Sequence, residues 1–99
     1  MYREKTVGVV VPAYNEEVLI RTVIETMPTF VDKIIIVNDK SSDNTAAVVR
    51  EYVEKEPDRV ILIDLKENQG VGGAIAEGYK WARDNEIDCT AVMAGDAQM

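Results

Sequence analysis

Four short hydrophobic runs alternate with longer stretches of mixed polarity along the 99 residues of this chain. The runs are rich in β-branched residues, and they cover Val7–Val11, Ile34–Val37, Val60–Ile63 and Thr90–Ala94. Short runs that are continuous rather than alternating are typical of strands that are covered on both faces of a parallel sheet. The pattern therefore predicts four strands, of which the first and second are buried within the sheet. The first is bounded by Pro12, which cannot donate to a neighbouring strand.

The stretches between the first three runs have apolar residues at helical spacing, three or four residues apart. In the first stretch Asn15 is a good N-cap, and Pro28 ends the helix. The predicted inner face of this helix consists of Leu19, Ile20, Val23, Ile24 and Met27. The predicted inner face of the second helix, which Pro57 follows, consists of Ala46, Val49 and Val53. Each stretch thus predicts one helix that packs on the sheet.

A third helix follows the glycine-rich run Gly70–Gly73. Its predicted inner face consists of Ala74, Ile75, Gly78, Tyr79 and Ala82. Gly78 lies within this helix, where a glycine costs about 1 kcal/mol relative to alanine. Close packing of the helix on the sheet would explain why a glycine is tolerated there.

The predicted elements form three strand–helix units followed by a fourth strand. With short loops and right-handed crossovers, this order makes an α/β fold with a three-layer, doubly wound and mostly parallel sheet, similar to a Rossmann fold. We expect the strand order 3-2-1-4, with the crevice between the first and the fourth strand. Residues 1–99 are enough for a single domain with a modest core.

The composition narrows the class of partner. The chain has 18 acidic and 11 basic residues and a net charge of -7, which argues against binding to a nucleic-acid backbone. It has no histidine, so catalysis or metal binding by histidine is excluded within these residues. The single cysteine, Cys89, adjoins an apolar run and is expected to be a small buried side chain. The first residues do not resemble a signal peptide, and no apolar run reaches the ~18 residues of a membrane span.

Polar residues follow every predicted strand. They are Tyr14, Asn15 and Glu16 after the first, Asn38 and Asp39 after the second, Glu67 and Asn68 after the third, and Asp96 and Gln98 after the fourth. In a parallel sheet of this order the carboxyl ends of the strands converge on one edge, and open α/β sheets bind their ligands there. The sequence therefore predicts a binding site at that edge.

Single residues of this set have more than one explanation. Asp39 could accept hydrogen bonds from a nucleotide base, or it could be a loop or capping residue. Glu16 could contact a ligand or only stabilise the start of the first helix. Tyr14 could stack on a base or pack across the turn. Position alone leaves these alternatives open.

Two further features could bind a nucleotide diphosphate. The run Gly70–Gly73 resembles an anion loop at a helix N-terminus, although a tight turn with close packing would also explain it. It is neither a GxGxxG motif after the first strand nor a P-loop. Asp96 and Gln98 offer two oxygen ligands one residue apart, which suits Mg²⁺ or Mn²⁺, although the polar end of a strand would explain them as well.

Four motifs, taken together, resemble one enzyme family. They are Val9–Glu16, Val37–Thr45, Asn68–Ala74 with Gly78, and Gly95–Met99. In this order they resemble the inverting glycosyltransferase family 2, which has the GT-A fold and includes the dolichyl-phosphate mannose and glucose synthases. The resemblance covers nearly the whole chain.

The resemblance implies a role for each motif. Pro12, Ala13, Tyr14 and Glu16 would line the nucleotide pocket, Asp39 would bind the base, and the loop at Gly70 would lie near the nucleotide. Asp96 would bind the nucleotide as well. Together with Gln98 it would coordinate a divalent cation, Mg²⁺ or Mn²⁺, that bridges the diphosphate. The cation would neutralise the charge that grows on the leaving nucleoside diphosphate.

The chain departs from the family's pattern at three positions. Asn38 stands in place of the usual first Asp of the second motif. Lys40 stands in place of the usual Gly, so the turn there has to accept a side chain. Ala94 stands where many members have the first Asp of the metal motif.

By the same resemblance, the protein would be a hexosyltransferase that uses a GDP- or UDP-sugar, with a polyprenyl (dolichyl) phosphate as a possible acceptor. Residues 1–99 would be the truncated N-terminal part of a larger enzyme, whose acceptor site and any catalytic base lie beyond Met99. This piece would be inactive alone and could self-associate through an exposed apolar face. We expect a cytoplasmic protein, whose full-length form could associate with the cytoplasmic face of a membrane.

Two other classes share the α/β pattern. Sugar-nucleotide nucleotidyltransferases typically carry a Gly-rich, basic loop after the first strand, whereas Pro12–Glu16 has neither a glycine nor a basic residue. Response-regulator-like modules, which are not catalytic, need an acidic pair after the first strand and a phosphorylatable Asp after the third. Asp64 lies near the second of these places, but Pro12-Ala13 does not fit the first. The sequence favours a glycosyltransferase over both.

Overall fold

The computed structural model describes residues 6–14, 17–40, 44–67 and 69–93. Within these ranges strands and helices alternate in the order β1 (Val7–Ala13), α1 (Glu17–Glu25), β2 (Lys33–Asn38), α2 (Thr45–Lys55), β3 (Val60–Asp64), α3 (Gly70–Asp84) and β4 (Cys89–Val92). The strands form one parallel sheet in the order β3-β2-β1-β4. The predicted fold class and strand order are therefore confirmed.

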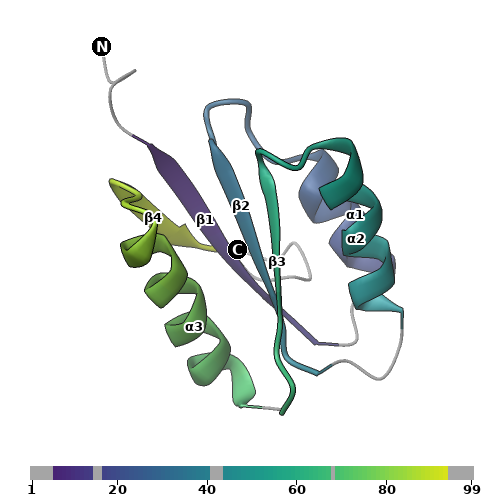
Figure 1. Cartoon of the computed structure of the whole chain (residues 1–99). Coiled ribbons are helices and arrows are strands. Elements are labelled where there is room, and N and C mark those ends of the chain that lie inside the picture. Colours follow the sequence, from purple (N-terminus) through teal and green to yellow (C-terminus); the bar gives the residue numbers. More distant parts are fainter. Residues whose placement is uncertain (1–5, 15–16, 41–43, 68, 94–99) are drawn as a thin grey trace.

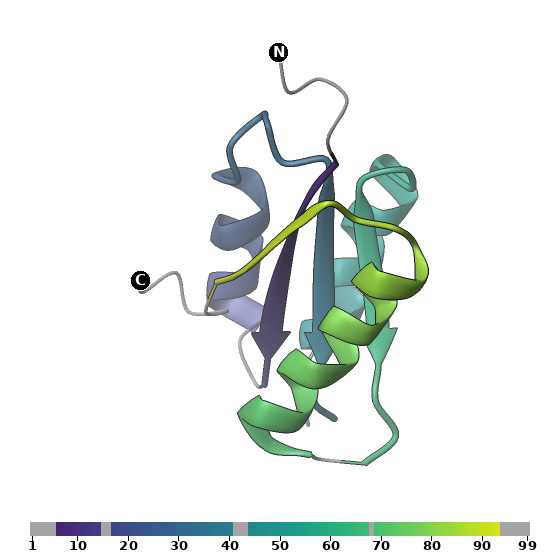
Figure 2. The ribbon, with the colours of Figure 1, turned by 90° about the vertical axis from the view of Figure 1, so that its left-hand side faces the viewer.

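The helices lie on both faces of the sheet, which makes three layers (Figure 1). Helices α1 and α2 pack side by side on one face, and α3 covers the other. Figure 2 shows α3 in front of the strands, with α1 and α2 behind them. This arrangement buries the central strands on both faces, as their continuous hydrophobic runs predict.

Two apolar clusters fill the spaces between the layers. Successive strand residues point to opposite faces of a sheet, so each strand contributes to both clusters. Val9 and Val11 of β1 belong to the cluster under α1 and α2, whereas Val10 belongs to the cluster under α3. The α3 cluster is smaller, and its buried members are Val10, Ile35, Val37, Ala74 and Ala82.

Strand β1 continues through Pro12 to Ala13, two residues further than predicted. The strand can continue because the backbone of Pro12 points away from β2. The carbonyl of Val10 accepts a hydrogen bond from Met93, next to β4, whereas the carbonyl of Ala13 accepts one from Asp39, next to β2. Because these sides alternate along a strand, Pro12 faces β4, where the described pairing already ends at Val10. Pro12 therefore removes no hydrogen bond from the pairing with β2.

The predicted inner faces of the helices are correct at their centres and wrong at their flanks. In α1 the residues Ile20, Val23 and Ile24 are buried, as is Met27 just after the helix, but Leu19 is 41% exposed. In α3 Tyr79 is 43% exposed beside the buried stripe. In α2 the buried residues are Thr45, Val48, Val49 and Tyr52, so that of the predicted set only Val49 is fully covered. In α1 and α3 the stripe that contacts the sheet is thus narrower than the apolar stripe of the sequence, and in α2 it is rotated from it.

Gly78 is where α3 comes closest to the sheet. A Cβ added there would lie 2.3 Å from Cγ1 of Val10, in the middle of β1. Real carbon atoms keep about 3.5–4.0 Å apart, so no side chain fits between the helix and the strand. The expectation that close packing explains this glycine is confirmed.

The prediction of a buried cysteine is wrong, because Cys89 is exposed. It begins β4, which lies at the edge of the described sheet and alternates between exposed and half-buried residues. The strand covers Cys89–Val92 rather than Thr90–Ala94, and Ala94 lies outside the described residues. Few described residues cover this strand, so its first side chain stays in contact with solvent.

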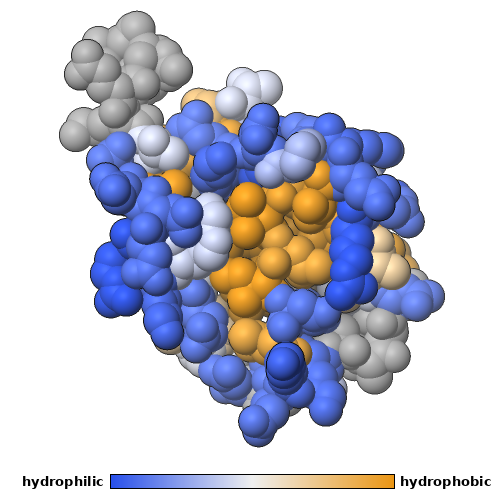
Figure 3. Space-filling model, in the orientation of Figure 1, coloured by the Kyte–Doolittle hydropathy of each residue, from blue (hydrophilic) through white to orange (hydrophobic). Residues whose placement is uncertain are grey.

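Some hydrophobic surface remains uncovered at the opposite edge of the sheet. Figure 3 shows a hydrophobic area over β3, between α3 and the other two helices, with hydrophilic residues around it. Ile61 and Ile63 of β3 pack against the α3 cluster and are only half-buried. Among the described residues no helix is long and apolar enough to span a membrane.

Candidate functional site

The carboxyl ends of three strands form one row. Ala13 of β1 is in register with Asn38 of β2, and Asn38 is in register with Asp64 of β3. The polar residues that follow these strands therefore lie along the same edge, as predicted. The predicted residues Glu16, Asp96 and Gln98 lie outside the described residues.

The end of β1 contributes Pro12, Ala13 and Tyr14. Pro12 is half-buried and Ala13 is 2% exposed, so both belong to the wall of the sheet rather than to a free loop. Tyr14 follows them and is 48% exposed. The ring of Tyr14 is therefore partly in contact with solvent.

The carboxylate of Asp39 binds the start of α3. Its Oδ1 accepts a hydrogen bond of 2.6 Å from the backbone N–H of Gln69, and its Oδ2 accepts one of 2.8 Å from that of Gly70. Asp39 is only 4% exposed. Amides at a helix N-terminus have no partner within the helix, and a capping side chain supplies one. The capping alternative thus describes the contacts of Asp39, although the helix it caps begins 31 residues further along the chain.

The glycine-rich run is not a loop before α3 but its first turn, since α3 begins at Gly70. Gly70 has a φ of +77°, a left-handed backbone that side chains disfavour. This explains one glycine of the run by backbone geometry. At Gly72, by contrast, an added Cβ would have nothing within 4 Å, so the turn is open on that side.

Asn38 takes part in a polar cluster beside Asp39. Its Nδ2 donates a hydrogen bond of 2.8 Å to Oδ1 of Asp64, whose Oδ2 accepts one of 2.8 Å from Arg50. Asn38 is 3% exposed. A carboxylate in its place could not donate and would face the charge of Asp64. The departure from the usual family residue at position 38 is thus matched by the acceptor on β3, a partner that sequence reasoning missed because it lies on another strand.

Lys40, where the family usually has Gly, has a φ of 54°. This is the left-handed region that makes glycine the usual choice, and it costs other residues about 1–2 kcal/mol. The turn after β2 therefore keeps the backbone shape that the family motif implies and accepts a lysine in it.

A second polar cluster lies between α1 and α2, away from this edge. The hydroxyl of Tyr52 donates to Glu25, and Arg21 donates to the same hydroxyl at 3.4 Å. Burial of the phenol raises the pKa of Tyr52, and its hydrogen bond to Glu25 raises it further. The cluster contains none of the predicted site residues, and it joins the two helices to each other.

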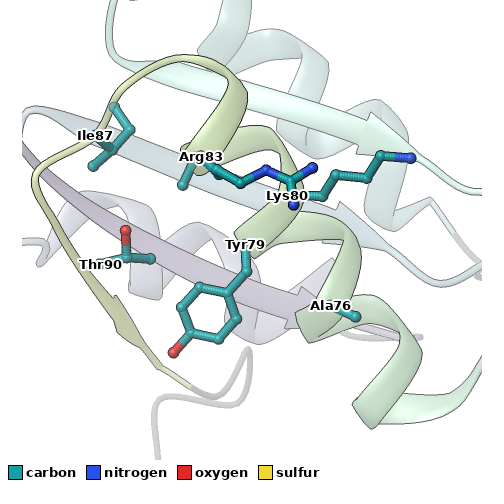
Figure 4. A pocket seen from close by; sticks show the side chains of 7 residues that line it. Ala76, Tyr79, Lys80, Arg83, Ile87 and Thr90 are labelled. Carbon is teal, nitrogen blue, oxygen red and sulfur yellow. The ribbon is translucent and has the colours of Figure 1, made fainter.

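A pocket of about 680 Å³ lies between α3 and the start of β4 (Figure 4). It is lined by Ala76, Tyr79, Lys80, Ala82, Arg83, Ile87 and Thr90. None of these is a predicted site residue, and the pocket lies along the flank of α3 rather than at the row of strand ends. Within the described ranges no three acidic or cysteine side chains are grouped so as to hold a metal ion.

A parallel α/β sheet whose strands end in a row of polar residues, next to the glycine-rich start of a helix, defines the class of nucleotide-binding α/β domains. The comparison with known families makes the assignment specific. Residues 8–99 match the sequence model of Glycosyl transferase family 2. The chain belongs to this family, and the resemblance of its four motifs is confirmed.

Known proteins agree with this assignment in sequence and in structure. The dolichyl-phosphate beta-glucosyltransferase of Dictyostelium discoideum is 36% identical over 88 residues, which are 77% of this chain and 27% of that protein. A UDP-N-acetylglucosamine–dolichyl-phosphate N-acetylglucosaminyltransferase of Methanococcus voltae is 34% identical, over 96% of this chain and 43% of that protein. The mannosyltransferase PcManGT of Pyrobaculum calidifontis, solved with GDP-Man and Mn²⁺, has a TM-score of 0.73 and 25% identity over 91% of this chain and 27% of its own.

The chain thus spans between 27% and 43% of the length of these curated relatives. The sheet and its helices have the fold of the matching part of GT-A glycosyltransferases.

Proposed function

We propose that residues 1–99 are a single nucleotide-sugar-binding domain, the truncated N-terminal part of a larger glycosyltransferase. In its whole form the enzyme transfers a sugar from a nucleotide diphosphate sugar to a polyprenyl phosphate. The observation that carries this proposal is the family match over residues 8–99. The acceptor is supported by relatives in Dictyostelium and Methanococcus that are named for transfer to dolichyl phosphate.

The donor is a GDP- or UDP-sugar held with a divalent cation. PcManGT has GDP-Man and Mn²⁺ bound, and the Methanococcus relative is named for UDP-N-acetylglucosamine, so both bases occur among similar proteins. We assign the cation, Mn²⁺ or Mg²⁺, to Asp96 and Gln98, whose oxygen atoms are ligands that such ions prefer. When bound, the cation neutralises the charge that develops on the leaving diphosphate.

The remaining residues of the site hold and orient the nucleotide. We propose that the exposed ring of Tyr14 stacks on the base, that Pro12 and Ala13 lie beside it, and that Glu16 and Asp96 also bind the nucleotide. Asp39 and Gly70 bring the start of α3 to the same edge. The acceptor site and any catalytic base lie beyond Met99. A phosphate acceptor is ionised at neutral pH and needs little help from a base.

We place the reaction at the cytoplasmic face of a membrane, because a polyprenyl phosphate is held in one. The proposal predicts that, when cells are fractionated, the full-length protein is found with the membranes. It also predicts that protease digests the protein from the same side of these membranes before and after an alkaline wash. Full-length protein found only in the soluble fraction would contradict this part of the proposal.

Calorimetry of the full-length protein with GDP-sugars and UDP-sugars, with and without Mn²⁺, tests the donor and the metal together. We expect saturable binding that needs the metal and is lost in Asp96→Ala. Asp84→Ala, at the exposed end of α3, is the matched control and should bind as the wild type does. Binding that depends on neither the metal nor Asp96 would refute the metal assignment. Turnover of a nucleoside triphosphate with a sugar phosphate would instead favour the nucleotidyltransferase alternative.

A further inference from the structure

We propose that the outer edge of β3 is an interface between two copies of this protein, which pair there as antiparallel strands around a two-fold axis at Leu62. β3 is the last strand of the sheet, and of the described strands only β2 pairs with it. The edge lies on the other side of the sheet from the apolar pocket beside β4. Pairing there joins the two sheets into one continuous sheet.

The sequence of β3 lacks the features that usually keep an edge strand from pairing. Proteins protect such strands with lysine or proline, with bulges, or with elements that cover the edge. Val60–Asp64 contains neither lysine nor proline, and it follows β2 in unbroken register. Its three central residues are only half-buried, and Figure 3 shows the hydrophobic area over this strand between the helices. An edge of this kind is a template for another strand.

The backbone of β3 presents a row of hydrogen-bonding groups on its outer side. The carbonyl of Arg59 and the N–H of Leu65 both bond to residues of β2. Successive residues of a strand direct these groups to alternate sides, so the residues between them whose groups point away from β2 are Val60, Leu62 and Asp64. Within the described residues the N–H of Val60 already donates to the carbonyl of Glu56 at 2.9 Å. Its carbonyl and the groups of the other two residues face the outer side.

These groups select the register of the two copies. In an antiparallel pair, the residues that exchange hydrogen bonds must both point toward the partner strand. Centring the pair on Leu62 matches all three outward residues with one another, because Leu62 faces its own copy and Val60 faces Asp64. Ile61 of one copy then faces Ile63 of the other at a position without hydrogen bonds, where the Cα atoms come within about 4.5 Å.

The side chains suit this register. Ile61 and Ile63 pack against the apolar cluster under α3 but are only half-buried, so each covers the other across the axis. Ile63 also lines a hollow of about 220 Å³ between β3 and α3, beside Trp81. Asp58, two residues before the strand, comes near Lys66 of the second copy, two residues after it. The two-fold axis repeats each of these contacts, so apolar side chains meet at the centre and opposite charges at both ends.

Disulfide trapping in the full-length protein tests the register. Leu62→Cys is made in a background in which serine replaces the exposed Cys89 and any cysteine beyond Met99. The two introduced thiols lie on residues whose Cα atoms are about 5.5 Å apart, which a disulfide can span. Asp64→Cys is the matched control, because it lies in the same strand and is more exposed, but its Cα atoms in the two copies are roughly 14 Å apart.

Oxidation should join the two copies in Leu62→Cys and leave Asp64→Cys uncross-linked. Cross-linking of Asp64→Cys to the same extent, or no cross-linking of Leu62→Cys, would overturn the register.

Sedimentation of the full-length protein tests the interface without a cross-link. The wild type should be a dimer, and Ile63→Lys should raise the dissociation constant of the dimer at least roughly tenfold, because it disrupts both apolar contacts at the axis. Glu77 and Asp84 line the same hollow, so the lysine has acidic neighbours and the monomer should stay folded, which urea denaturation verifies. Val18→Lys makes a similar change at a side chain of α1 that is 79% exposed, and it should leave the dimer intact.

Each outcome bears on the interface separately from the proposed function. A wild type that sediments only as a monomer overturns the inference, whether another part of the protein or nothing covers β3. A dimer that persists in Ile63→Lys uses a different surface and overturns it as well. Neither measurement depends on a nucleotide, so a failure to bind one refutes the proposed function and leaves the interface standing.

Discussion

Replacing Gly78 by alanine tests the packing of α3 on the sheet. An added Cβ would lie 2.3 Å from Cγ1 and 3.0 Å from Cγ2 of Val10. To restore ordinary carbon contacts of about 3.5–4.0 Å, the helix or the valine has to move by roughly 1.2–1.7 Å. Val10 is completely buried in β1, one of the two central strands. Overpacking of this kind costs about 1–3 kcal/mol, against a gain of about 1 kcal/mol for alanine in a helix.

Gly72→Ala is the matched control, because it makes the same change in the same helix with nothing within 4 Å of the new Cβ. It should raise the free energy of unfolding by up to about 1 kcal/mol, since only the helix propensity changes. Gly78→Ala should leave the free energy of unfolding unchanged or lower it by up to about 2 kcal/mol, once the helix gain offsets part of the overpacking cost. Urea denaturation measures both variants. Equal stabilities for Gly78→Ala and Gly72→Ala would refute the close contact between α3 and β1.

Further predictions concern the polar clusters, the turn and the exposed surface. Asn38→Asp should lower the free energy of unfolding by about 1–3 kcal/mol, because a donor to Asp64 is lost, and adding Asp64→Asn should recover part of this loss. A double-mutant cycle of these two substitutions that shows no coupling energy would contradict the pairing. Lys40→Gly should raise the free energy of unfolding by about 0.5–1 kcal/mol, because the relief of left-handed strain exceeds the entropic cost of glycine. A lower midpoint of urea denaturation in this variant would contradict the prediction. The folded state raises the pKa of Tyr52 from 10.0, so its contribution to stability is full below pH 10 and is lost as the pH rises through the raised pKa; denaturation at alkaline pH should show this loss in the wild type and not in Tyr52→Phe. Residues 1–99 alone should self-associate, because an apolar pocket beside β4 is lined by Phe30, which is 65% exposed. Analytical sedimentation that shows only monomer at high protein concentration would be the contrary result.

The fold could be predicted because its strongest signals are local. Each hydrophobic run is long enough for one strand, and the stretches between them have the spacing of helices. With right-handed crossovers, few sheet orders remain, and the observed one was the expected one. Gly78 could also be explained in advance, because an unfavourable residue within a helix needs a packing reason.

The flanks of the helices could not be predicted, since periodicity defines a stripe but not the residues that contact the sheet. Leu19 and Tyr79 continue the apolar pattern and yet lie partly in solvent. Cys89 was expected to be buried from its apolar neighbours alone, but its exposure depends on what covers the edge strand. Burial at an edge is a property of the packing between elements and has no local signal.

The candidate site likewise has features that the sequence could predict and features that it could not. That polar residues gather at the ends of three strands follows from a parallel sheet, and the register of Ala13, Asn38 and Asp64 places them in one row. The partners of Asp39 could not be predicted, because the amides that it binds are 30 and 31 residues away in the sequence. Position left its two explanations open, and the structure adds the capping hydrogen bonds that position could not reveal.

Sugar transfer by the full-length protein tests the central claim most directly. The protein, a labelled GDP- or UDP-sugar, Mn²⁺ and polyprenyl phosphate in detergent are incubated together, and the label in the lipid fraction is measured. We predict that the label enters the lipid fraction with at least one of these donors, that chelation of the metal abolishes the transfer, and that Asp96→Ala does the same. The contrary result is a folded protein that transfers no sugar to the lipid from either class of donor in the presence of metal.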